Sequence, residues 1–273
     1  MKKKTVKSIV TAAVVVPAVL IGVAGLSCKL NVVHYELQSD KLSKPVRIVL
    51  IADLHGSMFG DDQTDLINAV KEQTPDLIIY SGDILVDNMP NISPVMLLSG
   101  LKGLCPAYAV AGNHEVRTGN KTLCKNLFGD YGVVMLEGIS KTIIINDQTI
   151  ELCGLEDPMI GVEEFSGQLK YFTQYKPEHF AVLISHHAEL VESYKKMDFD
   201  LVLSGHAHGG QWRIPGLLNG LYAPEQGFFP KYTGGVYTYN NTTQIVSRGL
   251  VKFYMLPRFF NPPELVVLDI MPK

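Results

Sequence analysis

Five short apolar stretches of this chain are each followed by polar side chains that can bind a metal ion or transfer a proton. This repeated pattern constrains the fold more than any other feature of the sequence. The stretches are residues 46–52, 77–80, 107–111, 180–184 and 201–203, all rich in Val, Ile, Leu or Ala. Such runs are typical of strands buried in a sheet. The polar residues that follow them are Asp53 with His55, Asp83, Asn113 with His114, His186 with His187, and His206 with His208. Because α/β sheets bind ligands outside the carboxyl ends of their strands, we expect these residues to meet in one crevice.

The segments between these stretches predict the fold class. Apolar residues recur at helical spacing in 61–74, and we also expect helices at 93–101, 122–128 and 189–195. Turn residues predict two hairpins, one around Asn146-Asp147 and one around Asn241-Thr242, and a last strand at 264–269. Strands that alternate with helices favour an α/β protein, and the hairpins favour antiparallel additions. We therefore predict two mixed sheets packed face to face with helices outside.

The N-terminal segment, residues 1–28, has the pattern of a membrane anchor. Lysines at positions 2, 3, 4 and 7 precede a charge-free run from 8 to 28, which is long enough to cross a bilayer as a helix. The lysines favour a cytoplasmic N-terminus, so we expect a single-pass protein with its domain on the outer side of the cell membrane. A cleaved signal peptide and a lipid-modified Cys28 remain alternatives, giving a secreted or a lipid-anchored protein. We expect residues 29–45 to be a connector and residues 46–273 to form one domain that carries the five polar clusters.

The composition excludes several classes of protein. The net charge is −3, and there is no basic surface pattern of the kind that binds nucleic acid. Four cysteines, at 28, 105, 124 and 153, lack CxxC spacing and are too few for a disulfide scaffold. One pair of them could still form a disulfide bridge if the domain lies outside the cytoplasm.

The residue types at the strand ends predict a metal site. His206 and His208 are two positions apart, so in an extended segment both side chains point to the same side. The five clusters together offer carboxylates, imidazoles and a carboxamide oxygen but no thiolate, a mixture that suits Mn, Fe or Zn. Seven such side chains are more than one ion needs. If one carboxylate is shared they make two sites, an arrangement that recurs in enzymes that hydrolyse phosphate esters.

The ordered motifs resemble those of a known family. DLH at 53–55, GD at 82–83, GNHE at 112–115, SHH at 185–187 and GHAH at 205–208 resemble the five motifs of the calcineurin-like metallophosphoesterases. The resemblance covers residues 48–270. Sequence segments around the motifs, such as GHAHGGQWRIPG and RFFNPPELVVL, resemble the membrane-anchored or exported bacterial branch of this family. It implies a four-layer α/β/β/α sandwich. Ala188 and Ala207 depart from the usual pattern, but neither replaces a ligand.

The resemblance also implies a role for each motif residue. The implied ligands of the first divalent ion are Asp53, His55 and His208. Those of the second are Asn113, His186 and His206, and Asp83 bridges the two ions. His114 resembles the residue that stabilises the phosphoryl group or protonates the leaving oxygen. We add Arg213 and Arg248 as phosphate contacts, with ordinary surface arginines as the alternative.

These roles predict a hydrolase acting on phosphate ester or pyrophosphate bonds, either a phosphodiesterase or a phosphomonoesterase. We expect lipid or cell-envelope substrates, chosen by the loops 158–167 and 217–232. The alternative is a catalytically weak metal-binding scaffold of the cell envelope. The presence of all seven implied ligands and of His114 favours the enzyme. The sequence does not indicate an oligomeric state.

Overall fold

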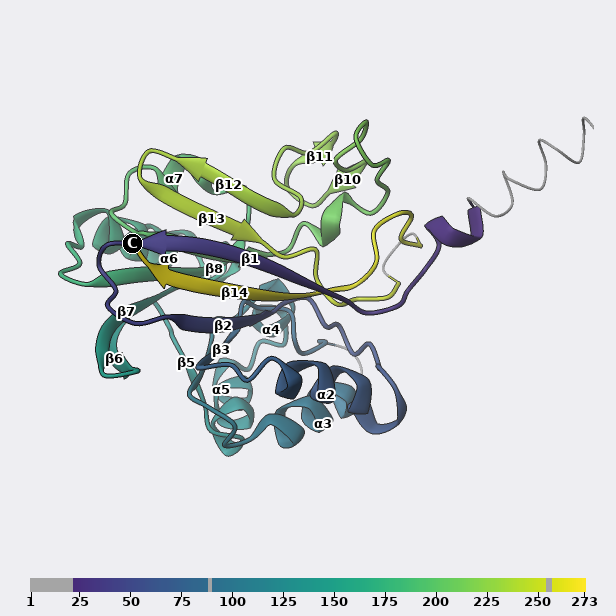
Figure 1. The fold of residues 1–273 in the computed structure, drawn as a ribbon, viewed down its shortest axis with the longest axis horizontal. Coiled ribbons are helices and arrows are strands. Elements are labelled where there is room, and N and C mark those ends of the chain that lie inside the picture. Colours follow the sequence, from purple (N-terminus) through teal and green to yellow (C-terminus); the bar gives the residue numbers. More distant parts are fainter. Residues whose placement is uncertain (1–21, 88–89, 254–256) are drawn as a thin grey trace, which may run out of the picture.

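The computed structural model, which describes residues 22–87, 90–253 and 257–273, contains two six-stranded mixed sheets (Figure 1). The strands of the first, which we call sheet A, lie in the order β1 (Asn31–Ser39), β14 (Glu264–Pro272), β2 (Val46–Ile51), β3 (Leu77–Tyr80), β4 (Ala107–Ala109) and β5 (Val133–Met135). In sheet A, β14 runs parallel to β1 and antiparallel to β2, and the remaining neighbours are parallel.

Sheet B has a parallel centre between two hairpins. Its strand order is β12 (Gly235–Tyr239), β13 (Thr242–Val246), β9 (Leu201–Gly205), β8 (Phe180–His187), β7 (Gln148–Leu155) and β6 (Ser140–Ile145). β13, β9, β8 and β7 are parallel neighbours, while β12 and β6 pair antiparallel at the two edges. A small separate hairpin consists of β10 (Tyr222–Ala223) and β11 (Gly227–Phe228).

Alternating apolar residues in the strands explain the layers. In β2, Ile48 and Leu50 face the core between the sheets, while Val49 and Ile51 face the helices on the outer side of sheet A. Both sides of the strand are therefore buried, which is why it reads as a continuous apolar run. The helices on sheet A are α2 (Thr64–Glu72), α3 (Ile92–Leu101) and α5 (Lys121–Asp130), and those on sheet B are α6 (Val162–Gln174) and α7 (Val191–Tyr194). The predicted α/β fold with two mixed sheets flanked by helices is confirmed.

Three expectations about the chain need correction. Residues 31–39 are not part of a connector, because β1 pairs with β14 along its whole length. Most of its side chains are exposed or half-buried, so it lacks the apolar signal of a central strand. The segment 158–167 is not a loop throughout, since η2 (Pro158–Ile160) leads directly into α6. The second hairpin turns at Asn240-Asn241, one residue earlier than predicted.

The N-terminal expectation falls mostly outside the described residues. The described chain begins with a helical turn at 22–25. Among the described residues, no helix combines the length and the apolar character that a bilayer crossing needs. The four cysteines are free thiols, so the bridge that the sequence left open is not formed.

Candidate metal centre

The first group of candidate metal donors lies beyond the ends of β2 and β9. Asp53 and His55 follow β2, His208 follows β9, and their ligand atoms all lie within 4.8 Å of one another. Both Asp53 oxygens also accept the backbone N–H of His206, at 3.0 and 3.2 Å. This contact joins the end of a strand in sheet A to the end of a strand in sheet B. The site therefore lies where the two sheets meet.

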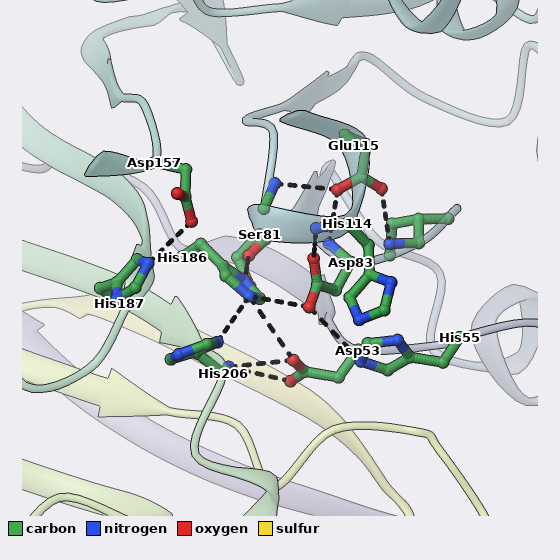
Figure 2. Close-up of polar contacts among 12 residues, drawn as sticks. Asp53, His55, Ser81, Asp83, His114, Glu115, Asp157, His186, His187 and His206 are labelled. Atoms are coloured by element: carbon green, nitrogen blue, oxygen red, sulfur yellow. Dashed lines mark hydrogen bonds and ion pairs between the residues drawn. The ribbon is translucent and has the colours of Figure 1, made fainter. Parts of the chain in front are cut away.

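The second group lies beside the first and combines Asp83 with His186 and His206 (Figure 2). His186 Nε2 is 3.2 Å from Asp83 Oδ2 and 3.1 Å from His206 Nδ1. The other ring nitrogen of His186 is 2.8 Å from the carbonyl oxygen of Ser81. Donation to that carbonyl fixes the tautomer in which Nε2 offers its lone pair to a metal. Asp83 Oδ2 also lies 3.4 Å from His55 Nε2, so this carboxylate reaches both groups.

Asn113, at the start of α4 (Asn113–Arg117), brings its side-chain amide to the same place. One end of the amide lies 3.0 Å from Asp83 Oδ2 and 3.2 Å from His206 Nδ1. Without a metal this end is the NH₂ group, which donates to both atoms, while the amide oxygen accepts from the Arg117 guanidinium. A carboxamide that turns its oxygen toward the same point adds an oxygen donor to the imidazoles and carboxylates. The donor set of carboxylate, imidazole and amide oxygens thus fits two divalent cations around Asp83.

The backbone at these donors is strained. Five of them have a positive φ, at 50° for Asp53, 44° for His55, 54° for Asp83, 66° for His206 and 48° for His208. Residues with a Cβ adopt this left-handed conformation at a cost of about 1–2 kcal/mol each. Such strain persists only where the surrounding structure holds it in place, and it is concentrated at functional sites.

Burial and mutual charge set the protonation of the donors in the absence of metal. Burial raises the pKa of Asp53 to about 6 and lowers the pKa of His55 to about 4. Burial alone would also raise the pKa of Asp83, but the charge of His186 and their hydrogen bond hold that pKa well below its usual value. A neutral His55 and an ionised Asp83 are the protonation states that bind a metal. Burial opposes the charge of His186, but Asp83 raises its pKa well above the usual value, so His186 must release a proton when a metal binds.

His114 lies at the rim of the donor groups. Its backbone N–H donates to Asp83 Oδ1 at 2.8 Å, and its Nδ1 is 3.1 Å from Asp87 Oδ1. Asp87 therefore orients the ring, and Nε2 has no hydrogen-bond partner among the described residues. His114 also forms a group with His55 and Asp83 whose ligand atoms lie within 4.8 Å. Its assignment to the phosphoryl group stays a prediction, because its position also suits a ligand.

The two arginines predicted as phosphate contacts lie together, but outside both donor groups. They line one cavity of about 450 Å³. Arg213 Nη1 donates to the carbonyl oxygen of Gly209 at 3.2 Å, directly after a predicted ligand. Arg248 forms an ion pair with the buried Glu264 at 3.1 Å. Their role as phosphate contacts stays a prediction.

A buried carboxylate that we did not predict as a site residue holds the metal loops in place. The Glu115 side chain accepts the backbone N–H groups of Asp83 and Gly112 at 2.9 Å, and those of Ile84 and Leu85 at 2.8 Å. It thus locks the loop after β3 against the start of α4. Glu115 is the last residue of the GNHE motif, and this position was the sequence feature from which a role at the site could have been predicted.

A second unpredicted carboxylate supports one of the donors directly. Glu225, in the turn between β10 and β11, is hydrogen-bonded to His206 Nε2, the nitrogen that faces away from His186. Metal-binding histidines commonly donate their other ring nitrogen to a carboxylate, which fixes the tautomer and raises the basicity of the ligand. Nothing local in the sequence around Glu225 indicates this contact.

His187, which follows the predicted ligand His186 and was given no role of its own, is held by two carboxylates. Its Nε2 is 2.7 Å from Asp157 Oδ2 and its Nδ1 is 2.6 Å from Glu189 Oε1 (Figure 2 shows the first). Burial opposes the charged ring, but the hydrogen bonds with these carboxylates raise the pKa of His187 to about 9. It is therefore an imidazolium at neutral pH, a form that does not bind metal.

Comparison with known proteins decides the family. Residues 46–210, more than half of the chain, match the family model described as calcineurin-like phosphoesterase. The chain belongs to this family. Membership confirms the family predicted from the motifs, and the predicted enzyme class is that of the family. The narrower assignment, to a membrane-anchored or exported bacterial branch of the calcineurin-like phosphoesterases, stays a prediction.

Individual relatives are distant. Phosphodiesterase YaeI of Escherichia coli is 30% identical over 233 residues, which cover 83% of each chain. An uncharacterized metallophosphoesterase of Helicobacter pylori is 29% identical over 86% of this chain, and the chain spans 62% of that relative's length. Among solved structures, the phosphopantetheinyl hydrolase of Mycobacterium tuberculosis is 12% identical with a TM-score of 0.47, over 73% of this chain and 88% of that one.

Proposed function

We propose that the protein is a binuclear metallophosphoesterase that hydrolyses phosphate ester or pyrophosphate bonds of lipid or cell-envelope substrates. The observation that carries the proposal is the meeting of two His–Asp donor groups at Asp83. The similarity to YaeI, which is named a phosphodiesterase, supports ester hydrolysis. The metals are expected to be Mn, Fe or Zn, since the donors are imidazole, carboxylate and amide oxygen.

Different residues of the chain have different roles in the proposed hydrolysis. When bound, divalent cations supply a hydroxide nucleophile near neutral pH and neutralise charge on the phosphate oxygens. Asp83 holds the two donor groups at a fixed separation, and Glu115 fixes the loop that carries it. His114, oriented by Asp87, is placed to give a hydrogen bond or a proton to the leaving oxygen. Arg213 and Arg248 line the neighbouring cavity and are proposed to contact phosphate.

The test is turnover by the purified chain after chelation and return of Mn²⁺. Hydrolysis of bis-p-nitrophenyl phosphate or p-nitrophenyl phosphate should depend on the added metal. Protein that binds two ions and hydrolyses neither compound would instead support the scaffold alternative. A panel of monoesters, diesters and pyrophosphate-linked lipids then identifies the bond that is cleaved.

A further inference from the structure

Large apolar side chains are exposed together at one end of the molecule. We call this set the apolar end: Val23, Leu26, Trp212, Ile214, Leu217, Tyr222, Phe228, Phe229 and Phe253. The exposed fractions of Phe228, Phe229 and Leu217 are 70%, 71% and 82%. Every exposed phenylalanine among the described residues belongs to the apolar end. A surface on which several large aromatic and aliphatic side chains are exposed is typical of contact with a protein or a membrane.

The apolar end and the metal centre lie at the same end of the two sheets. Figure 1 shows the turn at 22–25 and the β10–β11 hairpin toward one end of the long axis, with β6 toward the other. The metal donors follow the carboxyl end of β2, which runs antiparallel to β14. The backbone N–H of Leu221, just before β10, donates to the carbonyl oxygen of Gly210 at 2.8 Å, two residues after His208. The apolar end is thus attached directly to a metal loop.

The N-terminal segment leaves the domain through the apolar end. The backbone N–H of Phe260 donates to the carbonyl oxygen of Gly25 at 2.6 Å. A Cβ at Gly25 would lie 2.5 Å from Phe259 Cε2, so glycine lets the Phe259 ring pack directly against the backbone here. Phe259 in turn packs against Trp212, with ring centroids 5.9 Å apart. The charge-free run of residues 8–28 therefore joins the domain beside the exposed aromatic side chains.

The chemistry of this surface favours a lipid bilayer over a protein partner. The run that joins it is long and apolar enough to enter a bilayer, and lysines precede it. Trp212 has an exposed ring whose Nε1–H donates to the carbonyl oxygen of Pro257 at 2.8 Å, the amphipathic arrangement that is enriched at membrane interfaces. Arg213 lines a cavity together with Leu217, which places positive charge beside an apolar group, the combination that favours contact with lipid phosphates. Arg248 lines the same cavity but is paired with the buried Glu264.

We propose that the apolar end rests on the surface of a lipid bilayer, so that the metal centre faces the head-group region. This inference concerns orientation and does not depend on turnover. It goes beyond anchoring by residues 8–28, because a chain anchored only there would leave the domain free to point away. Docking on the bilayer also explains why apolar residues of the β10–β11 hairpin are exposed.

Trp212 is the only tryptophan in the sequence and reports directly on this surface. The 273-residue chain is reconstituted into phosphatidylcholine vesicles with ordinary or with brominated acyl chains, and Trp212 emission is compared. Because bromine quenches only at short range, docking predicts a clear loss of emission in the brominated vesicles. Equal emission in both kinds of vesicle would overturn the proposal. Protection of Trp212 from iodide without bromine quenching would also overturn it, since a protein partner or a second copy would then cover the surface.

Matched variants separate docking from anchoring. Replacing Phe228 and Phe229 with serine should reduce the quenching while the protein stays in the vesicles. Ile144→Ser removes a side chain that is 75% exposed on β6, toward the opposite end, and should leave the quenching unchanged. Far-UV circular dichroism checks that both variants are folded. Equal quenching in the double variant and the wild type would show that residues 8–28 alone bring Trp212 to the bilayer, and would contradict the proposal.

Discussion

Asp83 is the residue on which both donor groups depend. Asp83→Asn keeps the size of the side chain but removes its charge, and the NH₂ end offers no lone pair to a metal. We expect both ions to bind more weakly and activity to fall by at least ~10²-fold, as the loss of one electrostatic contributor typically causes. Metal content per chain, measured with turnover, checks this. Two retained metals with a near-normal rate would show that Asp83 does not bridge.

His114 should respond differently, because we assign it to the phosphoryl group. His114→Ala is expected to keep its metal content and to lose turnover by roughly 10²–10⁴-fold, the usual contribution of a general acid or base. The same metal analysis provides the check. If this variant loses metal, its position near His55 and Asp83 is that of a ligand, and the assignment is wrong.

Glu225 should matter for metal affinity although it is far from the other donors in the sequence. Its removal leaves His206 Nε2 without a carboxylate partner, and such losses weaken metal binding by about 10–100-fold. We expect Glu225→Ala to show this change in Mn²⁺ titration calorimetry of the metal-free protein, with Glu225→Gln between it and the wild type. Glu163→Gln, on the exposed face of α6, is the control and should not differ from the wild type. Unchanged affinity in Glu225→Ala would rule out the supporting role.

The sequence predicted the donors because each directly follows a buried strand, which makes its position a local property of the pattern. Asp83 and His186 meet only through the fold, yet the common edge of parallel strands implies that meeting. Glu225 and Asp87 could not be found in this way. Each contacts a histidine 19 or 27 residues away, and loops without a periodic pattern set these contacts.

At the scale of elements, prediction succeeded for the central strands and for the two hairpins at the edges of sheet B, and it failed for β1 at the edge of sheet A. β2, β3 and β9 are buried on both faces, and their apolar runs identify them. β1 is an edge strand whose stability comes from pairing with β14, more than 200 residues later. No local signal marks such a partner. α6 follows a Pro-containing turn and carries two buried residues, Gln168 and Phe172, so its apolar stripe is narrow.

The contact between β7 and the segment just before β8 contributes to stability in a pH-dependent way. Glu151 on β7 accepts the backbone N–H groups of Glu178 and His179, at 2.8 and 2.7 Å, just before β8 begins. Burial opposes its charge, but hydrogen bonds from Tyr175 and these N–H groups keep the pKa of Glu151 below its usual value. A folded pKa below the unfolded one stabilises above about pH 4.3, and this contribution disappears as the pH falls through the folded pKa.

The corresponding variant is Glu151→Gln. We expect it to lose about 1–3 kcal/mol of unfolding free energy at pH 7, because Glu178 and His179 both donate to Oε1 and a neutral amide oxygen accepts weaker hydrogen bonds than a carboxylate. Urea unfolding of both proteins at neutral and acidic pH measures the difference. The gap should narrow below pH 4. A gap that stays constant with pH would mean that packing, and not the charge, is responsible.

At the scale of the whole molecule, residues 1–28 are expected to hold the protein in the membrane. The charge-free run should make the 273-residue chain resist extraction with alkaline carbonate. A chain that begins at residue 29 should be released, and it should stay folded and active because β1 begins at Asn31. Recovery of mature protein starting near residue 29, entirely from the medium, would support a cleaved signal peptide instead.

The left-handed backbone conformation at five donors lowers the stability of the fold, although the side chains at these positions are needed for the reaction. Glycine has no Cβ and adopts this conformation without steric cost, so at each of these positions it would relieve strain in the metal-free chain. Natural selection for stability alone would therefore favour loss of the ligands. A lineage released from the need to hydrolyse phosphate would be expected to lose these side chains early, at positions where most proteins tolerate change least.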